Sequence, residues 1–100
     1  MKRAQVGIRV ALLALDPLSR YLLREGLRRR GHEVTAVGDV HELLRAAQVQ
    51  RFAVALLLVP PGAAPLLLRQ VRGLDPNLEV LWAAPPLRVS EAESLITQAA

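Results

Sequence analysis

The stretch that decides the fold is Ala-Leu-Leu-Leu-Val-Pro-Pro-Gly, at residues 55–62. Its apolar run has the length and composition of a strand buried on both faces, and the Pro-Pro-Gly turn ends that strand. Such strands are typical of parallel sheets with helices on both sides. Many parallel-sheet proteins keep a catalytic acid at this point in the chain, whereas this sequence has Leu57, Leu58 and Val59.

Residues 52–59 are one of four predicted strands. Residues 9–15 form a second continuous apolar run, and residues 78–83 form a shorter run that ends before Pro85. Residues 32–37 instead alternate between apolar and polar positions and contain β-branched side chains. The apolar runs predict buried strands, and the alternating segment predicts an edge strand with a more polar face.

The first of four predicted helices covers residues 17–30. Asp16 can cap its free N–H groups, Pro17 suits its first turn, and Gly31 suits its end. On a helical wheel, one half-turn is apolar and the opposite side is basic. The apolar positions are Leu18, Leu22, Leu23, Gly26 and Leu27, and the basic ones are Arg20, Arg24 and Arg28.

Three more helices are predicted, one after each later strand. They cover roughly residues 39–48, 64–73 and 90–99. Two pairs of residues have the spacing of a capping box, Asp39 with Glu42 and Ser90 with Glu93. Strands and helices therefore alternate along the whole chain, which predicts a doubly wound, flavodoxin-like α/β domain.

Composition argues against several classes of function. The chain of 100 residues has the size of one domain and contains no cysteine, which excludes disulfides, thiol nucleophiles and cysteine-bound metals. His32 and His41 have no partners at metal-ligand spacing and no triad-like neighbours. The six glycines form neither a GxGxxG motif nor a P-loop. We therefore expect no enzymatic activity and no cofactor or metal.

One uncharged stretch has to be weighed as a membrane span. Residues 52–68, which lie between Arg51 and Arg69, form a stretch of 17 uncharged residues. A membrane-spanning helix needs about 20 residues, and three prolines and Gly62 interrupt this stretch. No signal peptide is recognisable either. We therefore expect no membrane association and a cytoplasmic location.

The net charge of +4 is unevenly distributed. Residues 1–30 contain eight basic residues and two acids, whereas the remaining seventy residues have a net charge of −2. The basic face of the first helix could dock a protein partner or nucleic acid, but a solvated helix face is the simpler interpretation. Charge alone gives only non-specific affinity for nucleic acid, and the few aromatic residues are scattered. Nucleic acid is therefore not the partner that we expect.

Three segments together resemble the receiver domain of two-component response regulators. They are LLALDPLSRYLLREGLRRRGHEVTAV (12–37), ALLLVPPG (55–62) and LRQVRGLDPNLEVLWAA (68–84). That family has an acid-rich turn before a proline and a helix ending in glycine, and its third strand ends in an Asp-x-x-x-Pro-Gly turn. The resemblance covers nearly the whole chain. It implies a parallel sheet in the order 2-1-3-4 with helices on both faces.

The resemblance also implies where the chemistry of the family would lie. There, an acid ending the third strand accepts a phosphoryl group, two acids ending the first strand hold Mg²⁺, and a Thr or Ser ending the fourth strand senses the phosphate. A lysine ends the fifth strand, which here would lie beyond Ala100. The matching positions are Leu57 for the phosphoacceptor, Ala14 and Leu15 for the metal ligands, and Ala83 for the hydroxyl group.

All four of these positions are apolar, so the chain resembles a degenerate receiver, a pseudo-receiver. A leucine can neither attack phosphorus nor bind a hard cation. We expect a non-catalytic, phosphorylation-independent signalling module that regulates an effector through a protein partner or dimerisation. The candidate partner surface comprises Arg20, Arg24, Arg28 and Trp82, and Trp82 lies on a strand expected to form an open edge.

The fifth strand and fifth helix of the family are missing from this sequence. We expect residues 1–100 to form one pseudo-receiver domain, either truncated or the N-terminal part of a longer chain. The Met1 start and the abrupt apolar end favour a fragment or an engineered boundary. Two other functions stay open. One is a basic nucleic-acid-associated regulator that uses the first-helix arginines. The other is a small-molecule sensor or enzyme that uses the crevice at the carboxyl ends of the strands.

Overall fold

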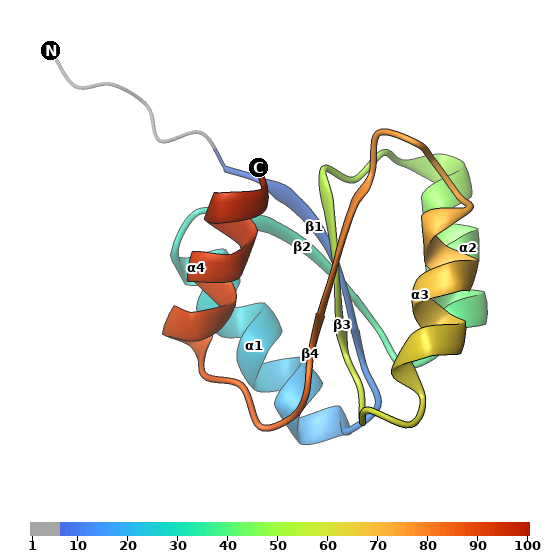
Figure 1. The fold of residues 1–100 in the computed structure, drawn as a ribbon. Coiled ribbons are helices and arrows are strands. Elements are labelled where there is room, and N and C mark those ends of the chain that lie inside the picture. The colour runs from blue at the N-terminus through green and yellow to red at the C-terminus, as the bar shows by residue number, and fades with distance from the viewer. Residues whose placement is uncertain (1–6) are drawn as a thin grey trace, which may run out of the picture.

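The computed structural model describes residues 7–100, and within them four strands alternate with four helices (Figure 1). The strands are β1 (Arg9–Ala14), β2 (Glu33–Val37), β3 (Val54–Leu58) and β4 (Glu79–Ala83). The helices are α1 (Pro17–Arg29), α2 (Val40–Val49), α3 (Ala64–Arg72) and α4 (Val89–Ala99). The predicted alternation of strands and helices is confirmed.

All four strands are parallel and form one sheet in the order β2-β1-β3-β4, as predicted. The two apolar runs, β1 and β3, occupy the centre, and only Arg9 among their residues is exposed. β2 and β4 form the two edges and are partly exposed. In this register Leu57 lies between Leu13 of β1 and Trp82 of β4.

Helices cover both faces of the sheet, with α1 and α4 on one face and α2 and α3 on the other (Figure 1). Because side chains alternate along a strand, each face has its own apolar core. The core under α1 and α4 comprises Val10, Leu12, Ala14, Leu23, Leu27, Val54, Leu56, Leu58, Ala92 and Ile96. The core under α2 and α3 comprises Ala11, Leu13, Val37, Leu43, Phe52, Ala55, Leu57, Val59, Ala64 and Val71.

Both ends of α1 have the caps that the sequence predicts. The Asp16 carboxylate accepts a hydrogen bond of 2.9 Å from the backbone N–H of Ser19. Gly31 has a φ of 94°, a conformation that glycine adopts without strain. Its N–H donates to the carbonyl of Arg28, and the next N–H donates to the carbonyl of Leu27. These bonds satisfy the last carbonyl groups in the pattern of a Schellman motif.

The apolar half-turn of α1 is only partly buried. Leu23 and Leu27 are buried, whereas Leu18 and Leu22 are 65% and 54% exposed. The reason is that α4 begins beside Gly26, where a Cβ atom would lie 2.5 Å from Cγ2 of Val89. α4 therefore covers the C-terminal half of α1 and leaves the N-terminal half open.

The predicted capping box at Ser90 and Glu93 is wrong. Of the box predicted at Asp39 and Glu42, only the cap by Asp39 is confirmed, because the Glu42 carboxylate bonds to the N–H of Gly38 and not to that of Asp39. α4 already begins at Val89, and the Glu91 carboxylate accepts a hydrogen bond of 2.9 Å from the N–H of the preceding Arg88. In α2, Asp39 accepts from the N–H of Glu42 at 2.9 Å, and the Glu42 carboxylate accepts from the N–H of Gly38 at 2.7 Å.

Glu93 instead connects α4, through hydrogen bonds, to the segment between α1 and β2. Its carboxylate accepts hydrogen bonds from Nη1 of Arg30 and, at 3.1 Å, from Nε2 of His32. The ring of His32 is buried, and its Nδ1 accepts from the N–H of Ile8 at 3.2 Å. Nε2 must therefore carry the ring proton that is donated to Glu93.

The uncharged stretch at residues 52–68 forms β3, the turn after it and the first part of α3. The turn is closed by a 3.0 Å hydrogen bond from the N–H of Ala63 to the carbonyl of Pro60. No helix in residues 7–100 has both the length and the apolar character needed to cross a membrane.

Candidate functional site

The carboxyl ends of the strands are the candidate site, because open parallel sheets bind their ligands there. A cavity of about 190 Å³ opens at this end, between the β1–α1 turn, the end of β3 and the loop after β4. It is lined by Ala14, Leu15, Asp16, Ser19, Leu58, Pro60 and Pro85. Most of this lining is apolar.

Three of the four positions matched to receiver chemistry lie close to this cavity. Ala14 and Leu15 line it, and Ala14 is fully buried while Leu15 is 48% exposed. Ala83 lies in register with Leu58, which itself lies in register with Ala14. The three strands therefore present a row of hydrocarbon side chains where the resemblance would place metal and phosphate ligands.

Leu57, the position matched to the phosphoacceptor, lies on the other face of the sheet. Its side chain is fully buried in the core beneath α2 and α3 and does not line the cavity. The sheet thus brings all four positions to one end but distributes their side chains over both faces.

Asp16 is the one acid among the residues that line this cavity. The backbone N–H of Ser19 is the main cause that lowers the pKa of Asp16 below its ordinary value, and the Ser19 hydroxyl and the charge of Arg20 add to it. The carboxylate is therefore ionised at neutral pH and serves as the cap of α1. No three His, Asp or Glu side chains gather into a possible metal site anywhere in residues 7–100.

The three arginines predicted as a partner surface are partly engaged within the molecule. Arg20 donates a hydrogen bond of 2.8 Å from Nη1 to the carbonyl of Ala14, at the rim of the cavity. Arg24 and Arg28 both form ion pairs with Glu25, at 3.1 and 3.7 Å. The face is therefore less positive than the three guanidinium groups alone would make it.

Trp82 lies on β4 with 41% of its surface exposed. Its indole Nε1 donates a hydrogen bond of 3.0 Å to the carbonyl of Val59 at the end of β3. The ring is therefore fixed by a polar contact while much of its apolar surface faces solvent. This combination is typical of interface tryptophans.

The backbone of β4 is paired on one side only in the described part of the chain. The N–H of Glu79 donates to the carbonyl of Ala53, just before β3, and the carbonyl of Ala83 accepts from the N–H of Val59, just after β3. Since successive residues of a strand point to opposite sides, Val80 and Trp82 direct their N–H and C=O groups to the open edge. The predicted open edge strand is confirmed.

A second and larger cavity lies at the opposite, amino end of the sheet. It has a volume of about 640 Å³ and lies between the end of α2 and the turn from α3 into β4. The turn contains Asp75, Pro76 and Asn77, and it is closed by a 3.1 Å hydrogen bond from the N–H of Leu78 to the carbonyl of Asp75. Nothing in the sequence pattern indicated the cavity itself.

No family model and no curated protein matches this sequence. Solved structures do match. The receiver domain of the hybrid histidine kinase CckA has a TM-score of 0.73 at 21% identity, covering 91% of this chain and 97% of that chain. The chemotaxis response regulator CheY4 of Vibrio cholerae has a TM-score of 0.77 at 17% identity, covering 95% and 100%.

The structure of histidine kinase ThkA in complex with the response regulator protein TrrA also matches, with a TM-score of 0.73 at 15% identity, covering 92% of this chain and 97% of that chain. At these identities the likeness shows the fold. The chain therefore has a receiver-like fold of the flavodoxin-like type, with four parallel strands.

Proposed function

From this receiver-like fold, we propose that the chain is a non-catalytic signalling module that acts through protein–protein contacts and independently of phosphorylation. The apolar lining of the carboxyl-end cavity carries the proposal. A phosphoryl group there would meet Ala14, Leu15 and Leu58, and Asp16 as the single carboxylate of the lining. Phosphoryl transfer to a carboxylate needs both a nucleophile and oxygen ligands for Mg²⁺.

The surface that we propose for contact is the outer edge of β4, and the partner is a second copy of the chain. In an antiparallel pairing about a two-fold axis at Leu81, Val80 of one copy lies opposite Trp82 of the other. Both residues direct their backbone groups outward, so each such pair can exchange two hydrogen bonds. Residues 79–83 also contain no proline or lysine to protect the edge.

Such pairing gives the chain a way to regulate an effector without chemistry, because association of two copies brings bound or attached effectors together. The ThkA–TrrA structure is an example of a matched fold in a complex with a protein. Three arginines of α1 form hydrogen bonds or ion pairs within the molecule, namely Arg20, Arg24 and Arg28. These interactions favour a structural role for the three side chains over contact with nucleic acid phosphates.

Light scattering or sedimentation over a range of protein concentrations tests the β4 edge. We expect the mass of the native chain to approach that of a dimer, and Trp82→Lys to remain monomeric because it places a charge at the edge. Leu22→Lys makes a similar change at an exposed residue of α1 and should still dimerise. A native chain that stays monomeric, or a dimer lost in Leu22→Lys and kept in Trp82→Lys, would contradict this interface.

A further inference from the structure

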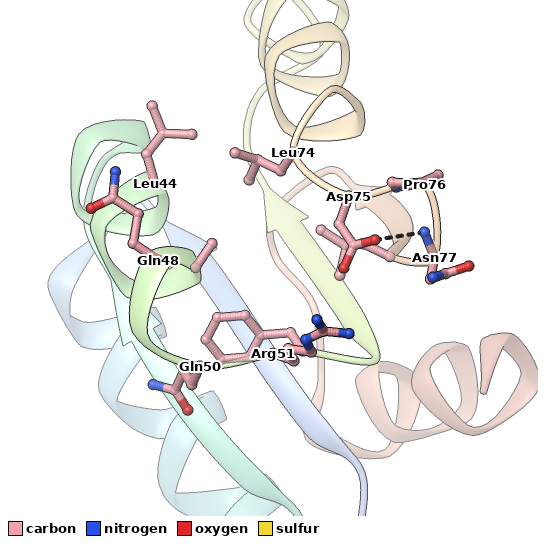
Figure 2. Close-up of a pocket in the computed structure, with 11 residues that line it drawn as sticks. Leu44, Gln48, Gln50, Arg51, Leu74, Asp75, Pro76 and Asn77 are labelled. Carbon is pink, nitrogen blue, oxygen red and sulfur yellow. Dashed lines mark hydrogen bonds between the residues drawn. The ribbon is translucent and has the colours of Figure 1, made fainter.

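The cavity at the amino end of the sheet has the size of a small-molecule site. Its volume of about 640 Å³ falls within the range of roughly 300–1,000 Å³ that is common for such sites. Figure 2 shows its two walls, with Leu44 and Gln48 on α2 and Leu74 to Asn77 on the turn that leads into β4. It shares no lining residue with the carboxyl-end cavity.

One part of this cavity is apolar. Leu44 and Leu74 extend toward one another from the two walls (Figure 2). Phe52, which is 7% exposed, contributes an aromatic ring to the lining, and Ala47 and Leu78 add further hydrocarbon surface. These side chains suit the apolar body of a small ligand.

The polar part of the cavity contains one positive and one negative side chain. Arg51 extends its guanidinium group toward the side on which Asp75 lies (Figure 2), but the two form no ion pair within 4.0 Å among the described residues. One Asp75 oxygen accepts a 2.9 Å hydrogen bond from the N–H of Asn77, and its other oxygen accepts none from residues 7–100. Two opposite charges therefore line one cavity without neutralising each other directly.

Helix ends add to the charge pattern. α2 ends at Val49 and α3 ends at Arg72, and both ends are next to residues that line the cavity. The carbonyl groups at the C-terminus of a helix carry partial negative charge and favour a nearby cation. The side of the cavity formed by Asp75, shortly after the end of α3, is therefore suited to a positive group. The end of α2 brings the same partial negative charge close to Arg51, so on that side only the full positive charge of the guanidinium group favours a negative group.

We propose that this cavity binds a zwitterionic α-amino acid with an apolar side chain. Its carboxylate accepts hydrogen bonds from Arg51, its ammonium group donates to Asp75, and its side chain lies against Leu44 and Leu74. A ligand with a single charge fits less well, because its charge would lie near the like charge of Asp75 or Arg51. This site is independent of the β4 edge and goes beyond the proposed interaction function.

Titration of the whole ¹⁵N-labelled chain with L-leucine, followed by NMR, tests the proposal. We expect saturable shifts in the amide signals of residues 44–52 and of Leu74, Asp75, Asn77 and Leu78. Two matched probes each carry half of the leucine head group: 4-methylpentanoate lacks the ammonium group, and 3-methylbutylamine lacks the carboxylate. Each should bind about tenfold more weakly or worse, because one charged hydrogen-bonding partner is lost. The proposal would be overturned if leucine gave no saturable shift, or if 4-methylpentanoate or 3-methylbutylamine bound as tightly as leucine.

Two substitutions test whether Arg51 and Asp75 contribute to the binding of leucine. Arg51→Gln and Asp75→Asn should each raise the Kd for leucine about tenfold or more. Asparagine at residue 75 keeps an oxygen that can accept from the N–H of Asn77, so the turn is preserved. Arg45→Gln removes an exposed arginine of α2 outside the cavity and should leave the Kd unchanged. Native affinity in either cavity variant would refute the assignment.

Discussion

At the scale of single residues, Leu57 and Asp16 have different surroundings at the carboxyl end of the sheet. Leu57 is fully buried, and its side chain belongs to the apolar core beneath α2 and α3. A carboxylate in its place would lose its hydration without gaining a partner. Asp16 remains ionised because the N–H of Ser19 stabilises its charge, and it is used as a helix cap.

Leu57→Asp is therefore expected to lower the free energy of unfolding by about 3–5 kcal/mol, since it removes buried hydrocarbon and buries a polar group. Urea denaturation measures the change. Leu66→Asp is the matched control: Leu66 is 60% exposed in the first turn of α3, so the change should stay within about 0.5 kcal/mol. A Leu57→Asp variant as stable as the native chain would show that the position is not an apolar core site.

At the scale of elements, α4 is the part that the sequence predicts least completely. The existence of the helix follows from its amphipathic pattern, and the caps at Asp16 and Asp39 follow from local spacing. Glu93, however, bonds to Arg30 and His32, which are 63 and 61 residues away. Local spacing cannot reveal such distant partners, and this is why the capping box at Ser90 was predicted wrongly.

Removal of the Glu93 carboxylate should weaken the attachment of α4 in a pH-dependent way. The hydrogen bond from Arg30, and after it that from His32, lowers the pKa of Glu93 below its ordinary value of 4.5. A lowered pKa stabilises the fold at pH above about 4.5, and the contribution is lost as the pH falls through the lowered value.

Thermal unfolding of Glu93→Gln should thus give a lower Tm than the native chain at pH 7, and the difference should shrink below pH 4.5. Glu33→Gln disrupts an exposed pair with Arg9 and should change the Tm much less. If the Tm of Glu93→Gln stayed below that of the native chain by the same amount down to pH 3, the ionised Glu93 carboxylate would not be what attaches α4.

The close approach of α1 and α4 predicts an unusual response to Gly26→Ala. Alanine usually stabilises a helix by about 1 kcal/mol relative to glycine, but here the new Cβ would lie 2.5 Å from Val89. We expect a net destabilisation of about 1–3 kcal/mol, and a much smaller one when the same change is made in the Val89→Ala background, where only Cβ of residue 89, at 3.2 Å, remains close. The four free energies of unfolding in this double-mutant cycle provide the test, and equal effects in both backgrounds would rule out the contact.

At the scale of the whole molecule, the two ends of the sheet have different characters. The carboxyl end is closed by Leu58, Pro60 and Pro85 around a small apolar cavity, whereas the amino end has a larger cavity with charged side chains. The alternation of elements and the central position of the apolar runs could be predicted, because both follow from local sequence patterns. The amino-end cavity could not, because it depends on how α2 and the α3–β4 turn are placed relative to each other.

Incubation with Mg²⁺ and acetyl phosphate, followed by mass spectrometry of the intact chain, tests most directly whether the apolar carboxyl end has replaced a phosphate-handling site. An active receiver domain treated in parallel controls for the phosphodonor. We predict that the mass of this chain stays unchanged, because Leu57, Ala14 and Leu15 supply neither a nucleophile nor oxygen ligands for the metal. A phosphoryl group found on Asp16, or on any other acid of the chain, would contradict this prediction.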